Sequence, residues 1–472
     1  MKSNTLSGKP NLFTTASPEN PVEVTCKSFA KAKTNKKDPK ALLVLTVTFI
    51  LLISGIWLTY VLQPEWLQFN LERMNSAWGY AFMVAAGLVL VFKLLFFGYQ
   101  LFLYFKYRSI PSVSDQELPT VTVIVPAYNE GKLVYDTLMS IAASDFPAEK
   151  MQLLAIDDGS KDETWYWMQV AKKRLGDRVE ILQQPQNKGK RHALYRGFKM
   201  GTGDVFVTID SDSIVKRDTL RNLVSPFIVD ENCGAVAGNV QVLNNQKAML
   251  AKMLNVSFVM SFEFVRSAES MLGTVMCTPG ALAAYRKDAV FACLNDWINQ
   301  TFMGTPSDIG EDRAMTNMIL KQGYKVLFQR NAHVLTNVPE KYKNLYKMFI
   351  RWGRSNVREN LVMGKFVFSD FRTEQKTGAR LLFLNQFMTI ATAYPFLLFM
   401  IYFLLTHPIL FISSTLLGIL LGSSFQAIFY AKRHNASESV WAYSYSLLYT
   451  FGLFWIMPYA IVTAGKKGWL TR

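Results

Sequence analysis

The chain has 472 residues, enough for two or three domains, and half of them are hydrophobic, which favours a membrane protein. The formal net charge is +16, and the basic residues gather in the N-terminal tail, beside the apolar runs and at the C-terminus. This placement favours contact with membrane lipids, and no nucleic-acid partner is expected because no nucleic-acid-binding pattern accompanies the charge. The four cysteines predict neither a zinc site nor a disulfide framework.

The N-terminal part of the chain predicts a tail followed by a helical hairpin in the membrane. Residues 1–40 are polar and lysine-bearing without hydrophobic periodicity, so a disordered basic cytoplasmic tail is expected. The apolar runs at 41–62 and 78–105 each exceed the roughly 20 residues that a transmembrane helix needs. We expect two transmembrane helices within 41–108, joined by a short loop at 63–77. Basic residues at both outer ends place the following domain in the cytoplasm.

Strand-like and helix-like stretches then alternate from residue 119 to about residue 340. The expected strands are 121–125, 153–156, 179–182 and 205–209, and the expected helices are 133–143, 164–175 and 191–200. Such alternation predicts an α/β domain with a mainly parallel sheet, inserted between membrane helices. A further helix, at 247–272, is expected to pack rather than to bind a ligand.

Three of the expected strands end in polar clusters, which are Tyr128 to Glu130, Asp157-Asp158 and Asp210-Ser211-Asp212. Ligands bind at the carboxyl edge of such sheets, so these clusters are expected to meet there. Asp210 and Asp212 are spaced so that both can face a divalent cation, which typically completes its shell with substrate phosphates. The alternative is that all three clusters are ordinary turns and helix caps.

Two later stretches carry further candidate residues. The acids of 308–312 precede a helical pattern, where capping is a sufficient explanation, but one of them could also act as a general base for an acceptor hydroxyl. The stretch 342–363 is cationic and aromatic, which is typical of an amphipathic interfacial helix. Its Trp352 is equally suited to form a flat platform for a sugar ring. We assign 341–380 to interfacial helices.

The C-terminal part returns to the membrane. Two transmembrane helices are expected within 381–430. The segment 440–464 is interrupted by Pro458, and as a full span it would place the basic C-terminus outside the cell. We therefore expect an interfacial or re-entrant segment in 440–472, with a fifth span as the alternative.

With these clusters in order, the chain resembles the processive family 2 glycosyltransferases, most closely the hyaluronan synthases and the rhizobial chitooligosaccharide synthase. The motifs that carry the resemblance are Asp157-Asp158, Gly189-Lys190-Arg191, Asp210-Ser211-Asp212, Gly310-Glu311-Asp312-Arg313 and Arg351-Trp352. The resemblance covers nearly everything from residue 121 to residue 472. It implies a cytoplasmic domain of the GT-A type, a plasma (inner) membrane location and a requirement for Mg²⁺ or Mn²⁺.

The resemblance also implies roles for single residues. Donor-binding residues would be Tyr128, Glu130, Asp157, Asp158, Lys190, Arg191 and Asp210, with Asp212 and Asp210 at the metal. Asp312 would be the catalytic base, with Glu311 and Arg313 beside it. Arg351 and Trp352 would hold the acceptor, and Trp469 and Arg472 belong to a gating-like segment at the C-terminus.

The implied function is an inverting, processive β-glycosyltransferase that polymerises UDP-N-acetylglucosamine, alone or with UDP-glucuronate, and extrudes the polysaccharide through its own channel. One position departs from the family, because Met348 stands where its acceptor motif has glutamine. Two alternatives therefore stay open at this point. One is a non-processive transferase that modifies a membrane lipid or makes a short chitooligosaccharide, and the other is a catalytically silent membrane scaffold.

Overall fold

The computed structural model describes residues 39–466, so nearly all of the expected tail at 1–40, together with Trp469 and Arg472, lies outside the described residues. Within this range, four helical stretches are long and apolar enough to cross a membrane. They are Pro39–Val61 (α2), Ala77–Lys106 (α4), Lys376–Thr406 (α15, Lys376–Ala391, and α16, Ala393–Thr406) and Pro408–Arg433 (α17). These stretches coincide with the four expected spans to within a few residues.

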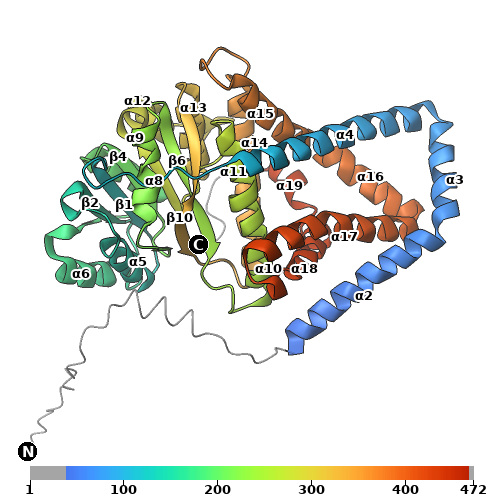
Figure 1. Cartoon of the computed structure of the whole chain (residues 1–472), viewed down its shortest axis with the longest axis horizontal. Helices are drawn as coiled ribbons and strands as arrows, with labels where there is room; N and C mark the ends of the chain where they lie inside the picture. Colours follow the sequence, from blue (N-terminus) through green and yellow to red (C-terminus); the bar gives the residue numbers. More distant parts are fainter. Residues whose placement is uncertain (1–38, 467–472) are drawn as a thin grey trace, which may run out of the picture. The chain divides into compact units, whose positions relative to one another are not determined.

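The prediction of a loop at 63–77 is wrong, because most of this segment forms helix α3, Gln63–Met74 (Figure 1). A proline in the first turn suits a helix start, since its missing N–H has no partner there in any case. Phe69 of α3 then stacks on Phe403 of α16 with ring centroids 4.9 Å apart. Tertiary packing of this kind stabilises a helix that its sequence alone signals weakly.

The α/β domain contains an eight-stranded sheet with the strand order β3-β2-β1-β4-β7-β6-β10-β5 (Figure 1). Its strands are β1 (Val121–Ala127), β2 (Met151–Asp157), β3 (Glu180–Gln183), β4 (Val205–Ile209), β5 (Ile214–Val215), β6 (Cys233–Val242), β7 (Leu282–Arg286) and β10 (Lys325–Thr336). The four expected strands form its parallel half, in which Val121 lies opposite Met151 on one side and Val205 on the other. The whole sheet is mixed, because β7 runs antiparallel to β4 and to β6.

Helices and short elements complete the domain and its junction with the membrane. The helices are α5 (Leu133–Ala142), α6 (Thr164–Leu175), α7 (Lys190–Met200), α8 (Thr219–Val224), α9 (Pro226–Val229), α10 (Met249–Val259), η3 (Met260–Val265), α11 (Arg266–Met271), α12 (Lys287–Ile298), α13 (Glu311–Lys321), α14 (Tyr342–Gly364), α18 (Trp441–Leu447), η5 (Leu448–Gly452) and α19 (Ile456–Val462). The short elements are η1 (Ala148–Lys150), η2 (Gly176–Arg178), η4 (Ala436–Glu438) and the hairpin of β8 (Thr301–Phe302) with β9 (Thr305–Pro306).

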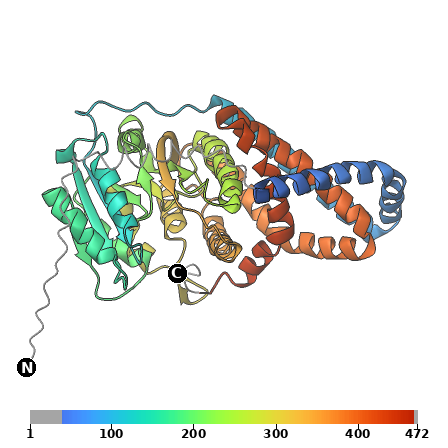
Figure 2. The same ribbon diagram turned by 90° about the horizontal axis from the view of Figure 1, so that it is seen from below.

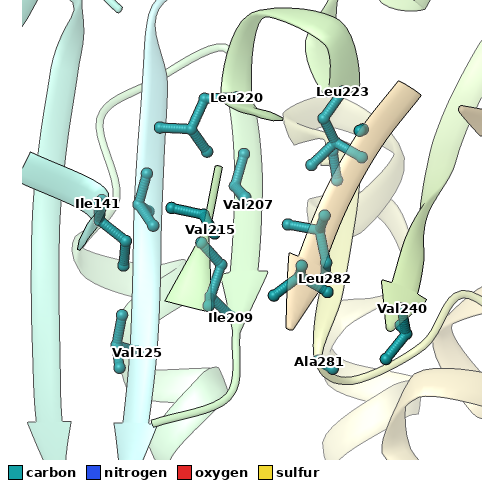
Figure 3. Close-up of a cluster of buried hydrophobic side chains, with 14 of the residues drawn as sticks. Val125, Ile141, Val207, Ile209, Val215, Leu220, Leu223, Val240, Ala281 and Leu282 are labelled. Atoms are coloured by element: carbon teal, nitrogen blue, oxygen red, sulfur yellow. The ribbon is translucent and has the colours of Figure 1, made fainter. Parts of the chain in front are cut away.

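The core of the domain lies on both faces of the sheet. Side chains alternate between the faces of a strand, so Val123 and Val125 of β1 join one buried cluster while Ile124 joins another. Figure 3 shows the first cluster, in which Val207 and Leu282 come from neighbouring strands. Burial on both faces explains why the central strands read as continuous apolar runs.

Segments from distant parts of the sequence pack together at the membrane end. Helices α2 and α17 lie side by side (Figure 2), and the Thr59 hydroxyl lies 3.5 Å from the Ser413 carbonyl. The Tyr107 hydroxyl, just beyond α4, donates a hydrogen bond of 2.6 Å to the carbonyl of Phe328 in β10. The C-terminal segment, α18 to α19, is bent by 47°, a geometry that suits either a re-entrant segment or a broken fifth span.

Candidate active site

One cavity of about 1400 Å³ opens at the carboxyl ends of the parallel strands. The predicted residues that line it are Tyr128, Asp158, Lys190, Asp210, Asp212, Glu311, Asp312, Arg313, Arg351 and Trp352. Its wall also includes Asn385, Gln386 and Thr389 of α15 and Tyr449 of η5. The same cavity therefore extends from the sheet edge to the helices at the membrane end.

Asp210 and Asp212 stand at this edge because β4, a run of five fully buried residues, ends directly before them. Asp210 Oδ1 lies 2.5 Å from Lys190 Nζ, and Asp212 Oδ1 accepts a hydrogen bond of 3.3 Å from the Thr336 hydroxyl. The described residues contain no group of three or more metal-ligating side chains. Two carboxylates on one cavity wall nevertheless fit Mg²⁺ or Mn²⁺, because such hard cations need only one or two protein carboxylates beside phosphates and water.

The double acid after β2 has two different environments. Asp157 is fully buried, and its carboxylate accepts hydrogen bonds from Ser160 and from the Gln183 amide. Asp158 lines the cavity and accepts from the backbone N–H groups of Lys188 (3.0 Å) and Gly189 (2.7 Å). Burial raises the pKa of Asp158 above its usual value. Asp157 thus holds its turn together, while Asp158 shapes the loop before α7.

Lys190 connects the strand edge with the start of α13. Its Nζ lies 2.5 Å from Asp210 Oδ1 and 3.4 Å from Glu311 Oε1. Burial alone would lower the pKa of Lys190, but the nearby carboxylates outweigh that effect and raise the pKa above its usual value. The side chain therefore carries its positive charge at any physiological pH.

Asp312 is half-buried in the first turn of α13, beside Glu311. Burial and the neighbouring negative charge of Glu311 raise the pKa of Asp312, although Lys190 and Arg351 act in the opposite direction. Arg313 follows, and its guanidinium bonds the amide oxygens of Asn356 in α14 and of Gln386 in α15, the latter at 2.5 Å. A carboxylate with a raised pKa on a cavity wall is suited to accept a proton.

Residues 119–355 match the model of the Glycosyltransferase like family 2. The chain belongs to this family. The expected resemblance is thereby confirmed, and so is the expected GT-A-type fold, here with a mixed sheet.

Among similar proteins, an N-acetylglucosaminyltransferase of Rhizobium meliloti (strain 1021) is 34% identical over 251 residues, which are 53% of this chain and 58% of that one. The chain thus spans less than two thirds of that relative's length. A hyaluronan synthase of Streptococcus pyogenes is 27% identical over 369 residues, covering 75% of this chain and 83% of the synthase. Among solved structures, a mannosyltransferase of Pyrobaculum calidifontis in complex with GDP-Man and Mn²⁺ has a TM-score of 0.49 at 20% identity, with 78% of this chain and 99% of that chain covered.

Besides the fully buried Asp157, two donor residues expected in this family 2 domain do not line the cavity. Arg191 is 3% exposed and donates hydrogen bonds to the Trp297 carbonyl (2.7 Å) and to Gln300 (3.1 Å). In this structure Arg191 packs α7 against α12, and its contact with the diphosphate stays a prediction. Glu130 also lies outside the cavity wall, so its contact with the donor stays a prediction.

The acceptor motif of the glycosyltransferase domain lies on one face of α14. Trp352 is 40% exposed, and it contacts Phe349 edge-on with ring centroids 5.5 Å apart. Met348, one turn earlier, also lines the cavity but is only 7% exposed. Trp352 thus borders the cavity beside the apolar side chain of Met348.

Sequence reasoning missed the polar residues that α15 contributes to this site. Gln386 bonds Arg313, and its neighbour Asn385 accepts a hydrogen bond of 2.7 Å from Lys93 of α4. A signal for them exists, since amide side chains inside an apolar run commonly mark a functional position. Which face of the helix they occupy depends on the packing of α15 and is not encoded in a local pattern.

Proposed function

We propose that this protein is a membrane-embedded, inverting β-glycosyltransferase that polymerises UDP-sugars and passes the product through its own membrane region. The observation that carries the proposal is the shared cavity, which joins Asp210 and Asp212, Asp312 and Trp352 with polar residues of α15. A donor site, a base and an acceptor platform in one enclosure are what glycosyl transfer requires. The name of the Rhizobium meliloti relative favours N-acetylglucosamine as one of the sugars.

At the donor side, Asp210 and Asp212 would hold Mg²⁺ or Mn²⁺, which stabilises the negative charge on the leaving diphosphate. Lys190 adds a cationic hydrogen-bond donor to the same phosphates, because its ammonium lines the cavity beside Asp210. Tyr128 and Asp158 border the part of the cavity assigned to the uridine and ribose.

At the acceptor side, Asp312 takes the proton from an acceptor hydroxyl. The acceptor oxygen bonds the anomeric carbon while the bond from that carbon to the diphosphate breaks, so UDP leaves with the electron pair. One displacement of this kind inverts the anomeric centre and gives a β-linkage from an α-linked donor. A positioned base typically contributes about 10² to 10⁴ in rate.

Trp352 would stack the acceptor sugar, and the amides of α15 would accompany the product toward the membrane helices. Met348 favours the second candidate function, a non-processive transfer to a lipid or a short oligosaccharide, because an apolar wall offers the acceptor fewer hydrogen bonds. The two candidates share the donor chemistry and differ in the acceptor and in the length of the product.

The test uses the full-length protein in detergent with Mg²⁺ or Mn²⁺ and with single and paired UDP-sugars. UDP release and product size are followed, and Asp312→Asn is the matched control. Long polymer from UDP-N-acetylglucosamine, alone or with UDP-glucuronate, is the expected result. Short or lipid-linked product would establish the non-processive candidate. UDP release no faster than that of Asp312→Asn for every sugar would contradict both and favour a silent scaffold.

A further inference from the structure

Glu311 is a buried acid to which the proposed mechanism gives no task. Its side chain is only 6% exposed at the first position of α13, and its Oε1 lies 3.4 Å from Lys190 Nζ. Lys190 is 14% exposed and lies closer to Asp210, with 2.5 Å between Nζ and Oδ1. One ammonium is therefore shared between an acid of the expected metal site and an acid of the helix that carries Asp312.

Gly280, in the loop before β7, lies directly beside this ammonium. A Cβ atom added at Gly280 would lie 2.6 Å from Lys190 Nζ and 3.8 Å from each carboxylate oxygen of Asp210. A side chain at position 280 would therefore push the ammonium aside. Glycine at this position is what allows so close an approach.

A divalent cation and the Lys190 ammonium compete for Asp210. Two positive groups on one partly buried carboxylate repel each other, so the binding of a metal–nucleotide weakens the hold of Asp210 on Lys190. The ammonium has three N–H donors, and phosphate oxygens are strong acceptors for them. Glu311 belongs to α13 and not to the strand edge that would hold the metal, so metal binding would leave its contact with the ammonium available.

We infer that Glu311 is a positioning residue for Lys190, and that Lys190 moves from Asp210 to the diphosphate when the metal–nucleotide binds. This inference rests on the proposed function, since it requires a metal-bound nucleotide donor. Before binding, the ammonium neutralises Asp210. After binding, it contacts the leaving group, and its contact with Glu311 links an occupied donor site to the helix that holds Asp312.

The test measures two affinities of the full-length protein in detergent. Mn²⁺ alone is titrated by electron paramagnetic resonance, and UDP is titrated by calorimetry at saturating Mn²⁺. Lys190→Met removes the competitor, so Mn²⁺ alone should bind about fivefold tighter or more while UDP binds about tenfold weaker. Glu311→Gln removes one partner of the Lys190 ammonium, which should then bind Asp210 more tightly. Mn²⁺ alone should therefore bind more weakly to this variant. Lys199→Met, the same change at the far end of α7, should alter neither affinity.

The diagnostic result is that Lys190→Met raises the affinity for Mn²⁺ and lowers the affinity for UDP. A purely structural role of Lys190 would weaken both affinities together. Gly280→Ala is the second variant, and it should also tighten Mn²⁺ binding, since it crowds the ammonium but leaves Asp210 in place. The inference would be overturned if Mn²⁺ binding were unchanged or weaker in both Lys190→Met and Gly280→Ala while the wild-type protein binds Mn²⁺ and UDP. The proposed function would still stand in that case. Wild-type protein that binds neither would overturn the proposed function as well.

Discussion

Asp312 shows how its neighbours set the acidity of one residue. Burial and the charge of Glu311 raise the pKa of its carboxyl group, whereas Lys190 and Arg351 lower it, and the balance lies above the usual aspartate value. A base works only when it is deprotonated. The proposed activity should therefore be lost on acidification at a higher pH than an ordinary aspartate would give.

Changing Glu311 tests this balance through the pH profile. Glu311→Gln removes a negative charge beside Asp312, so the pKa of Asp312 falls and the acidic limb of the rate of UDP release should move to lower pH. The rate of UDP release is measured at saturating donor across a range of pH for the wild type and the variant. The pH at which the rate falls on the acidic side is then compared between the two proteins. A limb that moves to higher pH would contradict the assignment of Asp312 as the base.

At the scale of the element, α13 depends on the residue that precedes it. Gly310 is the N-cap and adopts φ +74°, a left-handed conformation that side chains rarely take. A Cβ at this position would also collide with the side chain of Ser355 in α14. The first turn of α13, which carries Glu311 and Asp312, is thus held against α14 by a position that tolerates no side chain.

Gly310→Ala should therefore both destabilise the protein and misplace the base. Left-handed strain costs about 1–2 kcal/mol, and the clash with Ser355 adds to it. Gly304→Ala is the control, because Gly304 has φ +75°, close to that of Gly310, but no atom within 4 Å of the added Cβ. Thermal unfolding in detergent and UDP release should both fall further for Gly310→Ala. Equal losses in the two variants would show that the contact with Ser355 is unimportant.

The elements also differ in how far the sequence predicts them. The bounds of β4 and of α6 follow from the sequence, because continuous apolar runs and helical periodicity are local signals. Strands β6 and β10 are absent from the sequence-based prediction. Their pairing joins segments about 90 residues apart, and in such strands the neighbouring strand decides the conformation more than the residue itself does.

At the scale of the whole molecule, the connections of the membrane helices lie on one side. Phe69 of α3 contacts His407, which links α16 to α17, with ring centroids 4.6 Å apart. The basic ends of α4 and α17 are at the opposite ends of their helices. Positively charged ends favour the cytoplasm, so we expect the α3 side to face outward.

Cysteine labelling of intact cells tests this orientation. In a variant whose four native cysteines are replaced by serine, Ser76→Cys should react with an impermeant maleimide, because Ser76 follows α3 and is exposed. Ser437→Cys, beyond the basic end of α17, should react only after the cells are opened. Labelling of Ser437→Cys from outside would reverse the proposed topology.

Product length depends on the whole path that the acceptor follows, and Met348 is the position at which we expect this chain to differ from the acceptor motif of its family. Met348→Gln adds an amide to the cavity wall one turn from Trp352, so the acceptor should be held longer and the product should lengthen. Met348→Leu, a change of similar volume, should leave the product length unchanged. Size-exclusion analysis of the radiolabelled product gives the comparison. Equal lengths from all three proteins would remove Met348 as a determinant.

The sequence by itself determined the family, the four apolar spans and the identity of the acids at the strand ends. These features depend on local periodicity and on short motifs, which need no knowledge of distant contacts. For the same reason, Asp210, Asp212 and Asp312 can be selected as candidates from their motifs alone.

Only the tertiary structure decided how those residues share one cavity. Arg191 and Lys190 are neighbours in one motif, yet Arg191 packs on Trp297 while Lys190 joins Asp210 to Glu311, because successive helical residues point in directions about 100° apart. The contribution of Gln386 likewise depends on α15 meeting α13. Contacts between segments that lie far apart along the chain form only when the whole fold brings them together, and no local pattern records them.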